Sequence, residues 1–316
     1  MPENRIRHII PEGGIPDGDP PPRTSSQRRA ADVHTGRAPG VYRVQDKDRP
    51  RAVARMRFKL TIEYAGTRYS GWQIQKNAKT VQGEIERAIH ASTATEDFEL
   101  AGAGRTDAGV HALRQVAHLD VSTTIPPETL RRRVNDELPS DISLLAVEPI
   151  AHRFHARHSA VARSYLYQIS RRRTAFAKPF VWWVKDDLDL PAMRSAAAQF
   201  VGLHDFRSFS DDDPTKKSTV VHVEALDIYE DGDLVLIHME GSHFIWKMVR
   251  RVVGVLAEVG RGKLSEAESA KFLLERSPRP AQVTAPASGL FLERVYYPGD
   301  ARNTPVQATV VVPPAL

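Results

Sequence analysis

Alternation of apolar and polar residues predicts several strands. Residues 58–64 place Phe, Leu, Ile and Tyr at every second position, which is typical of a strand with one buried face. Residues 117–121 and 165–169 repeat the pattern. Residues 223–239 predict a β-hairpin, with residues 230–233 as its turn.

Helical spacing and capping residues predict helices between these strands. Thr80 precedes residues 81–89, whose apolar positions share one helix face. Residues 126–127, both proline, open a short Arg-rich helix. Ser265 and Glu268 form a capping box for a later helix.

Two further helices are expected in the second half of the chain. Pro191 is suited to the first position of a helix that ends near Gly202. A strongly apolar helix is predicted from Phe244 to Val259, with Gly260 as its C-terminal cap. Because hairpin-linked strands alternate with helices in two halves of similar size, the predicted fold class is α+β with a largely antiparallel sheet.

Composition shifts divide the chain. Residues 1–55 hold eight of the 22 prolines and predict a disordered, basic N-terminal extension. Residues 56–149 and 150–298 form the two halves, and residues 299–316 a peripheral tail. The abrupt change of character at Met56 also suggests that this residue is the natural start.

Charge and residue usage narrow the class of protein. Of the net charge of +5, residues 1–55 carry +4, so a nucleic-acid surface on the remainder requires local clustering of basic residues. The absence of cysteine excludes disulfides, thiolate nucleophiles and cysteine-ligated metals. No apolar run approaches the roughly 20 residues that span a bilayer. A cytoplasmic protein without membrane association is expected.

The segment with the most unusual chemistry is residues 102–112, Gly-Ala-Gly-Arg-Thr-Asp-Ala-Gly-Val-His-Ala. Three glycines suggest positive φ or close ligand approach. We expect Asp107, held near Arg105 and backbone amides, to have a low pKa and to act as an anionic nucleophile or base. The residues alone leave open a tight turn with a surface ion pair. A dinucleotide-binding loop is excluded, because Asp107 stands where its third glycine would be.

This segment resembles the active-site signature of the bacterial tRNA pseudouridine synthase A family. The resemblance covers roughly residues 57–298 and continues in ordered blocks. Those blocks are residues 56–75, 80–89, 154–157, 163–167, 204–206 with 208–209, 244–260 and 285–290. It implies the pseudouridine synthase fold, with two similar halves sharing a central sheet flanked by helices.

The resemblance also implies roles for three residues. Asp107 matches the nucleophile, Tyr165 the tyrosine that stacks on the target base and can accept a proton, and Arg250 the arginine that pairs with the carboxylate. The implied reaction is isomerisation of uridine to pseudouridine in the anticodon stem-loop of tRNA, at positions 38–40, with base flipping. It requires no cofactor. The family works as a homodimer with tRNA as partner.

Basic residues outside this triad are the candidates for phosphate contact. They are Arg105, Arg114, Arg131, Arg132, Arg171, Arg172, Lys216 and Arg251. The acidic run 211–213 departs from the family, in which a basic or polar loop is commoner, and puts the details of tRNA contact in doubt. His152, His155 and His158 are not expected to bind a metal, because their spacing in a loop does not bring the rings together.

Two other functions remain as alternatives. A non-catalytic RNA-binding protein or tRNA chaperone could keep the fold, but it would have no need for the carboxylate of Asp107. A carboxylate-dependent glycosidase acting on nucleosides would require a second acidic group about 5–10 Å from the first.

Overall fold

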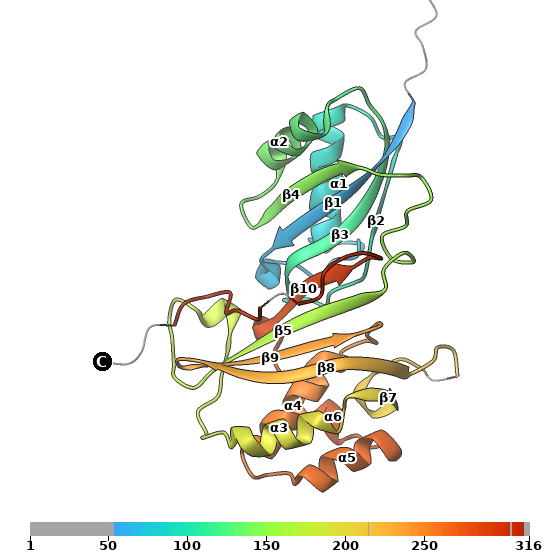
Figure 1. The fold of residues 1–316 in the computed structure, drawn as a ribbon. Helices are drawn as coiled ribbons and strands as arrows, with labels where there is room; N and C mark the ends of the chain where they lie inside the picture. The colour runs from blue at the N-terminus through green and yellow to red at the C-terminus, as the bar shows by residue number, and fades with distance from the viewer. Residues whose placement is uncertain (1–53, 214, 304, 313–316) are drawn as a thin grey trace, which may run out of the picture. The chain divides into compact units, whose positions relative to one another are not determined.

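The part of the chain that the structure describes forms one sheet of ten strands flanked by helices (Figure 1). The computed structural model describes residues 54–213, 215–303 and 305–312, so the predicted disorder of the N-terminal extension lies outside the described residues, apart from its last two. The strands are β1 (Arg55–Tyr64), β2 (Phe98–Gly102), β3 (His111–Ser122), β4 (Ile142–Pro149), β5 (Ala162–Ser170), β6 (Trp182–Trp183), β7 (Gly202–Asp205), β8 (Val220–Asp231), β9 (Leu234–Gly241) and β10 (Leu290–Tyr296). The α-helices are α1 (Val81–Thr93), α2 (Pro127–Glu137), α3 (Leu190–Ala198), α4 (Met248–Gly260), α5 (Glu266–Leu274) and α6 (Arg279–Gln282).

The sheet repeats one topology twice. Its main path runs β4-β1-β3-β10-β5-β9-β8-β7, and β2 pairs with β3 beside that path. The order β4-β1-β3-β2 in the first half therefore corresponds to β10-β5-β9-β8 in the second. The halves join where β3 and β10 run parallel, whereas the other pairs along the main path are antiparallel. The predicted α+β class with two similar halves is confirmed.

Each half has its own apolar core on one face of the sheet. In the first half, alternate side chains of β1 are buried and pack against α1 and α2, as the period-2 pattern predicted. In the second half, Tyr167 and Ile169 of β5 pack under α3, α4 and α5. Figure 1 shows these helices below the sheet in yellow and orange. The two cores meet near Tyr165, whose ring contacts both.

The C-terminal tail is not peripheral, contrary to the prediction. A third apolar cluster, on the opposite face of the central strands, includes Leu166, Leu236 and Phe291. The tail covers it with Val310 and Val312. Two polar contacts fasten the tail. The Thr309 N–H donates to Oε1 of Gln168 at 2.7 Å, and Arg302 pairs with Glu240 at 3.2 Å. The tail therefore belongs to the fold, because it shields apolar residues from water.

Local capping signals were predicted correctly. The Thr80 hydroxyl accepts the Gly83 N–H at the start of α1, and Ser265 and Glu268 form a complete capping box on α5.

No helix among the described residues is long and apolar enough to span a membrane.

Two helix boundaries were predicted wrongly. The helix expected from Phe244 begins only at Met248. Its last residue is Gly260, where an added Cβ would lie 2.6 Å from the Met193 sulfur, so the glycine serves helix packing rather than capping. The helix expected to reach Gly202 ends at Ala198.

Candidate active site

The segment between β2 and β3 carries Asp107, and backbone contacts fix its path. The backbone carbonyl of Thr106 accepts the backbone N–H of Trp72 at 3.1 Å. The Thr106 hydroxyl lies 2.8 Å from the Tyr64 hydroxyl. Gly71 has φ +93°, and a Cβ there would lie 2.6 Å from the Thr106 carbonyl oxygen. Gly109 has φ +79°, as expected for one of the loop glycines. The turn that carries Asp107 is therefore held in place by contacts with residues of the first half of the protein.

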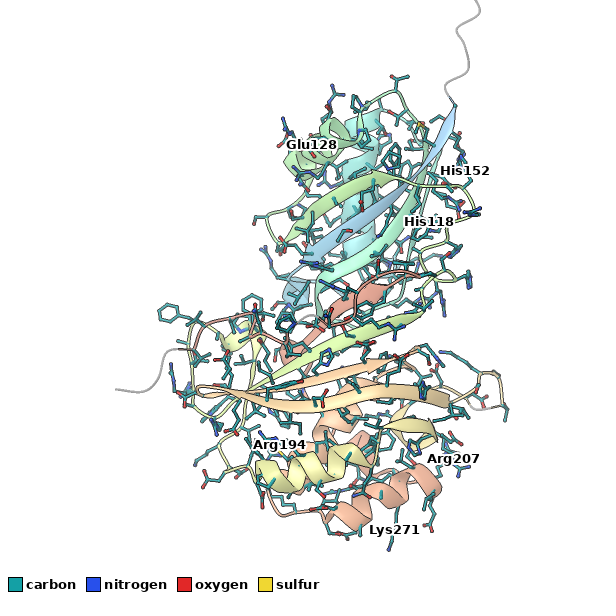
Figure 2. The ribbon with its side chains drawn as sticks, in the orientation of Figure 1. His118, Glu128, His152, Arg194, Arg207 and Lys271 are labelled. Carbon is teal, nitrogen blue, oxygen red and sulfur yellow. The ribbon has the colours of Figure 1, made fainter. Side chains whose placement is uncertain are left out.

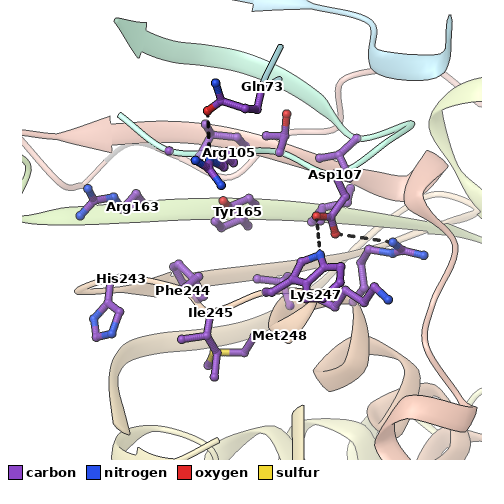
Figure 3. Close-up of a pocket in the computed structure, with 18 of the residues that line it drawn as sticks. Gln73, Arg105, Asp107, Arg163, Tyr165, His243, Phe244, Ile245, Lys247 and Met248 are labelled. Atoms are coloured by element: carbon purple, nitrogen blue, oxygen red, sulfur yellow. Dashed lines mark hydrogen bonds and ion pairs between the residues drawn. The ribbon is translucent and has the colours of Figure 1, made fainter. Parts of the chain in front are cut away.

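Two donors from the second half meet the Asp107 carboxylate. The Trp246 indole N–H donates to Oδ1 at 3.1 Å, and Nη1 of Arg250 lies 3.7 Å from Oδ2. The structure thus brings together Asp107 and Arg250, the two residues that were expected to pair. Figure 3 draws both contacts as dashed lines from Asp107. The site therefore forms only where the two halves of the sheet join.

The pKa of Asp107 lies above its ordinary value, contrary to the expected low pKa. Burial is the main cause, because it removes water from the charged form. Arg250 and the indole N–H of Trp246 oppose this effect but do not outweigh it. The carboxylate is thus poorly hydrated, which favours reactivity as a nucleophile once it is ionised.

Tyr165 offers an aromatic surface beside the carboxylate. It lies on β5 and packs edge-on against Phe244, with ring centroids 5.0 Å apart. Burial raises the pKa of Tyr165 to about 12, and the charge of Asp107 adds to the shift. Its hydroxyl therefore stays protonated at neutral pH. This favours a stacking role over the role of proton acceptor.

These residues line a cavity of about 980 Å³, large enough for a nucleotide. Basic side chains surround it, namely Arg105, Arg157, Arg163, Lys217, Lys247 and Arg250. Arg163 has a structural part as well. It donates to the backbone carbonyls of Ser242, Arg157 and Ala103 at 3.0, 2.9 and 3.4 Å and so ties three segments of the cavity wall together.

Comparison with known proteins decides the family. The sequence pattern of the family described as tRNA pseudouridine synthase matches residues 60–159 and 196–298. The chain belongs to this family. It is 43% identical to tRNA pseudouridine synthase A of Rhodopseudomonas palustris over 244 residues, covering 76% of this chain and 99% of that protein. It is 40% identical over 243 residues to tRNA pseudouridine synthase A 2 of Bacillus cereus, with 76% and 99% covered. It is 38% identical over 243 residues to tRNA pseudouridine synthase A 2 of Clostridium tetani, covering 76% of this chain and 98% of that protein.

The structure separates the candidate phosphate contacts into groups. Arg105 lies at the cavity rim, where its Nε donates to Oε1 of Gln73 at 3.0 Å. Arg114 is exposed on β3 outside the cavity lining. Arg251 was predicted wrongly as a phosphate contact, because its side chain is only 5% exposed and pairs with Asp211.

The remaining candidates are already paired on the surface. Arg131 and Arg132 both contact Glu128, which Figure 2 labels on α2. Arg171 pairs with Glu230, Arg172 with Asp233 and Lys216 with Asp213. Arg171 follows Tyr165 by six residues and lies just past the end of β5, about 20 Å away at the rise of an extended strand. None of these five lines the cavity.

Two carboxylates of the acidic run that departs from the family have partners within the protein, although Asp212 also lines the cavity. Asp211 pairs with Lys247 at 2.9 Å and with Arg251. Asp212 accepts the Trp246 backbone N–H and the Lys217 ammonium, each at 3.1 Å. Because these partners offset the charge of Asp211 and Asp212, the two carboxylates weigh less against tRNA contact than the sequence suggested.

Trp246 was missed by the sequence reasoning. The predicted helix included it, and a tryptophan in an apolar run gives no sign of polar function. One signal was present, since the residue immediately before Phe244 is His243 and not a favoured capping residue. Lys247 instead adopts φ +63° immediately before the helix, which turns the segment 244–247 into the cavity.

The histidine geometry also differs from expectation. The rings of His155 and His158 lie 4.3 Å apart, because Nδ1 of His155 accepts the backbone N–H groups of Arg157 and His158 in a tight turn. The ring of His118 also lies near that of His155, with the centroids 4.6 Å apart and the ring planes tilted by 56°. Even so, no group of three or more His, Cys, Asp or Glu side chains within the described part of the chain is arranged to hold a metal ion.

Proposed function

We propose that this protein isomerises uridine to pseudouridine in the anticodon stem-loop of tRNA, at positions 38–40, with Asp107 as the nucleophile. One observation carries the proposal: a half-buried carboxylate, paired with Arg250, faces a nucleotide-sized cavity with a basic rim in a member of the tRNA pseudouridine synthase family. The relatives are named for this activity on tRNA. The stem-loop position rests on the family resemblance.

The proposed reaction uses the cavity residues in sequence. The target uridine leaves its stack and enters the cavity, where Tyr165 offers a stacking face. Asp107 attacks the base at C6 or the ribose at C1′. The N1–C1′ bond breaks, the base turns, and C5 joins C1′. The bond to Asp107 is then broken to free the carboxylate, the C5 proton passes to solvent, and N1 takes up a proton. Oxidation state is unchanged and no water is added overall, so the reaction needs neither metal nor organic cofactor.

The glycosidase alternative finds no support in the cavity. The second carboxylate lining it is Asp212. Burial, the largest single influence, would raise the pKa of Asp212, but hydrogen bonds from the Trp246 N–H and from Lys217 outweigh it and hold this pKa below its ordinary value. Oδ2 of Asp212 accepts both of these hydrogen bonds, so this carboxylate is engaged within the protein, and the family match points to a different reaction.

Homodimerisation and a cytoplasmic location belong to the same proposal, because a tRNA-modifying enzyme of this family works where tRNA matures. The domain division proposed from the sequence also stands as a proposal. It places Asp107 in residues 56–149 and both Tyr165 and Arg250 in residues 150–298, so neither half has a complete site.

Tritium release tests the function directly. Unmodified tRNA transcript carrying [5-³H]uridine is incubated with the wild-type protein and with Asp107→Ala, and the pseudouridine positions are then mapped. Release by the wild type alone, with pseudouridine within positions 38–40, is the expected result. No release by either protein would favour the non-catalytic RNA-binding alternative, and equal release by both would overturn the assignment of Asp107.

A further inference from the structure

Both oxygens of the Asp107 carboxylate have a partner, and the two partners differ in kind. Oδ2 faces the guanidinium of Arg250, whereas Oδ1 accepts a hydrogen bond from the neutral indole of Trp246. The Arg250 contact, at 3.7 Å, is a long ion pair; the indole contact, at 3.1 Å, has ordinary hydrogen-bond length. The indole therefore makes the shorter contact and the more directional one.

Trp246 is itself held by the acidic run. Its backbone N–H donates to Oδ2 of Asp212 at 3.1 Å. The next residue, Lys247, has φ +63°, an unfavourable conformation for a side chain other than glycine or asparagine. Its ammonium pairs with Asp211 at 2.9 Å and lies 4.5 Å from the Trp246 ring centroid. These contacts compensate for the strained turn and fix the direction of the indole.

We propose that Trp246 is a positioning residue for Asp107 and that Asp212 fixes Trp246 in place. This inference rests on the proposed function. The indole N–H uses one lone pair of Oδ1 and sets the rotation of the carboxylate, while the other lone pairs stay available for attack. Because the indole is about half exposed, its main contribution is the hydrogen bond rather than burial in the core.

The hydrogen bond also bears on the charge of Asp107. The charged groups that face this carboxylate are Arg250, Lys247 and Asp211, and Tyr165 lies close by on β5. Arg250 and Lys247 favour the ionised carboxylate, and Asp211 disfavours it. The indole N–H favours the ionised form without adding charge. Loss of this donor should therefore leave the carboxylate protonated up to a higher pH.

The test compares Trp246→Phe with Trp183→Phe. Phenylalanine keeps an aromatic ring but lacks the N–H, and Trp183 is similarly exposed at a position outside the cavity. Single-turnover rates on the [5-³H]uridine tRNA transcript are measured from pH 5 to 9 with enzyme in excess. Trp246→Phe loses a hydrogen bond to a charged group. The acid limb of its pH–rate profile, where the rate rises as Asp107 ionises, should therefore move to higher pH by about half to one unit. The rate at pH 7 should fall about threefold to tenfold, while the tRNA dissociation constant changes less than about twofold.

Asp212→Ala provides a second test of the same arrangement. It keeps the tryptophan side chain but removes the acceptor for the Trp246 backbone N–H, so the indole is held less firmly and a smaller shift of the acid limb in the same direction is expected. Unchanged melting temperature in each variant establishes that folding is intact. A Trp246→Phe profile that coincides with that of the wild type overturns the positioning role. Inactivity of both the wild type and Trp183→Phe would instead overturn the proposed function.

Discussion

The Arg250 guanidinium joins Asp107 to a second segment of the chain. Nη1 lies 3.7 Å from the Asp107 carboxylate, while Nε donates to the backbone carbonyl of Ala285 at 2.8 Å. The Ala285 N–H in turn donates to the carbonyl of Arg250 at 3.0 Å. One side chain thus connects the loop of the first half with α4 and the segment before β10.

Replacing Arg250 should reduce the rate of the chemical step. Arg250→Gln keeps a donor but removes the positive charge, so the burial of Asp107 is no longer offset. We expect single-turnover pseudouridine formation at pH 7 to fall about 30-fold to 300-fold, roughly 2–3.4 kcal/mol of transition-state stabilisation. Arg250→Lys, which keeps the charge, should retain more activity than Arg250→Gln. Equal rates for the two variants would show that the charge is unimportant.

Removing the Asp107 charge should stabilise the fold. The folded-state pKa of this carboxyl is raised, so its contribution to stability is present at low pH and is lost as pH rises through that pKa. At pH 7.5, Asp107→Asn should therefore raise the melting temperature by about 1–3 °C. The gain should shrink at acid pH, where the wild-type carboxyl is protonated. Differential scanning calorimetry measures both, with the exposed Asp187→Asn as the control.

The ion pair between Arg57 and Asp120 should be important for stability. Nη2 of Arg57 on β1 lies 2.5 Å from Oδ2 of Asp120 on β3, and the two side chains are only 16% and 9% exposed, respectively. Arg57 also donates to the backbone carbonyls of His152 and Phe154. Arg57→Ala should lower the free energy of unfolding by about 2–4 kcal/mol, because it leaves the Asp120 charge buried.

A neighbouring arginine provides the control for that measurement. Arg55 pairs with Asp97 on the surface, where both side chains are exposed. Urea unfolding of Arg55→Ala should differ from the wild type by less than about 0.5 kcal/mol. A similar loss in both variants would mean that the deletion of any arginine from β1, rather than the buried pair, causes the effect.

Adjacent positions in the C-terminal tail should respond differently to a charge. Val312 is 8% exposed and packs on the central strands, whereas Val311 is 86% exposed. Val312→Asp should lower the free energy of unfolding by about 1–2 kcal/mol and increase binding of a hydrophobic dye. Val311→Asp should leave both within error. Equal behaviour of the two variants in urea unfolding would contradict the docked tail.

The family, the strand pattern and the local caps could all be predicted from the sequence. Period-2 alternation at residues 58–64 predicted β1, and Thr80 predicted the start of α1, because these signals depend on residues a few positions apart. The pairing of Asp107 with Arg250 was also predicted, but through the family resemblance. Spacing alone left Asp107 as a surface turn.

The tertiary structure decided what depends on distant segments. The start of α4 at Met248 could not be read from an apolar run, since Asp211 and Asp212 hold the preceding turn from another loop. The raised pKa of Asp107 is likewise a tertiary property, because it follows from burial between two halves of the sheet. Sequence therefore determined the family and the local elements by short-range chemistry. The environment of the carboxylate was decided by desolvation and by partners that only folding brings together.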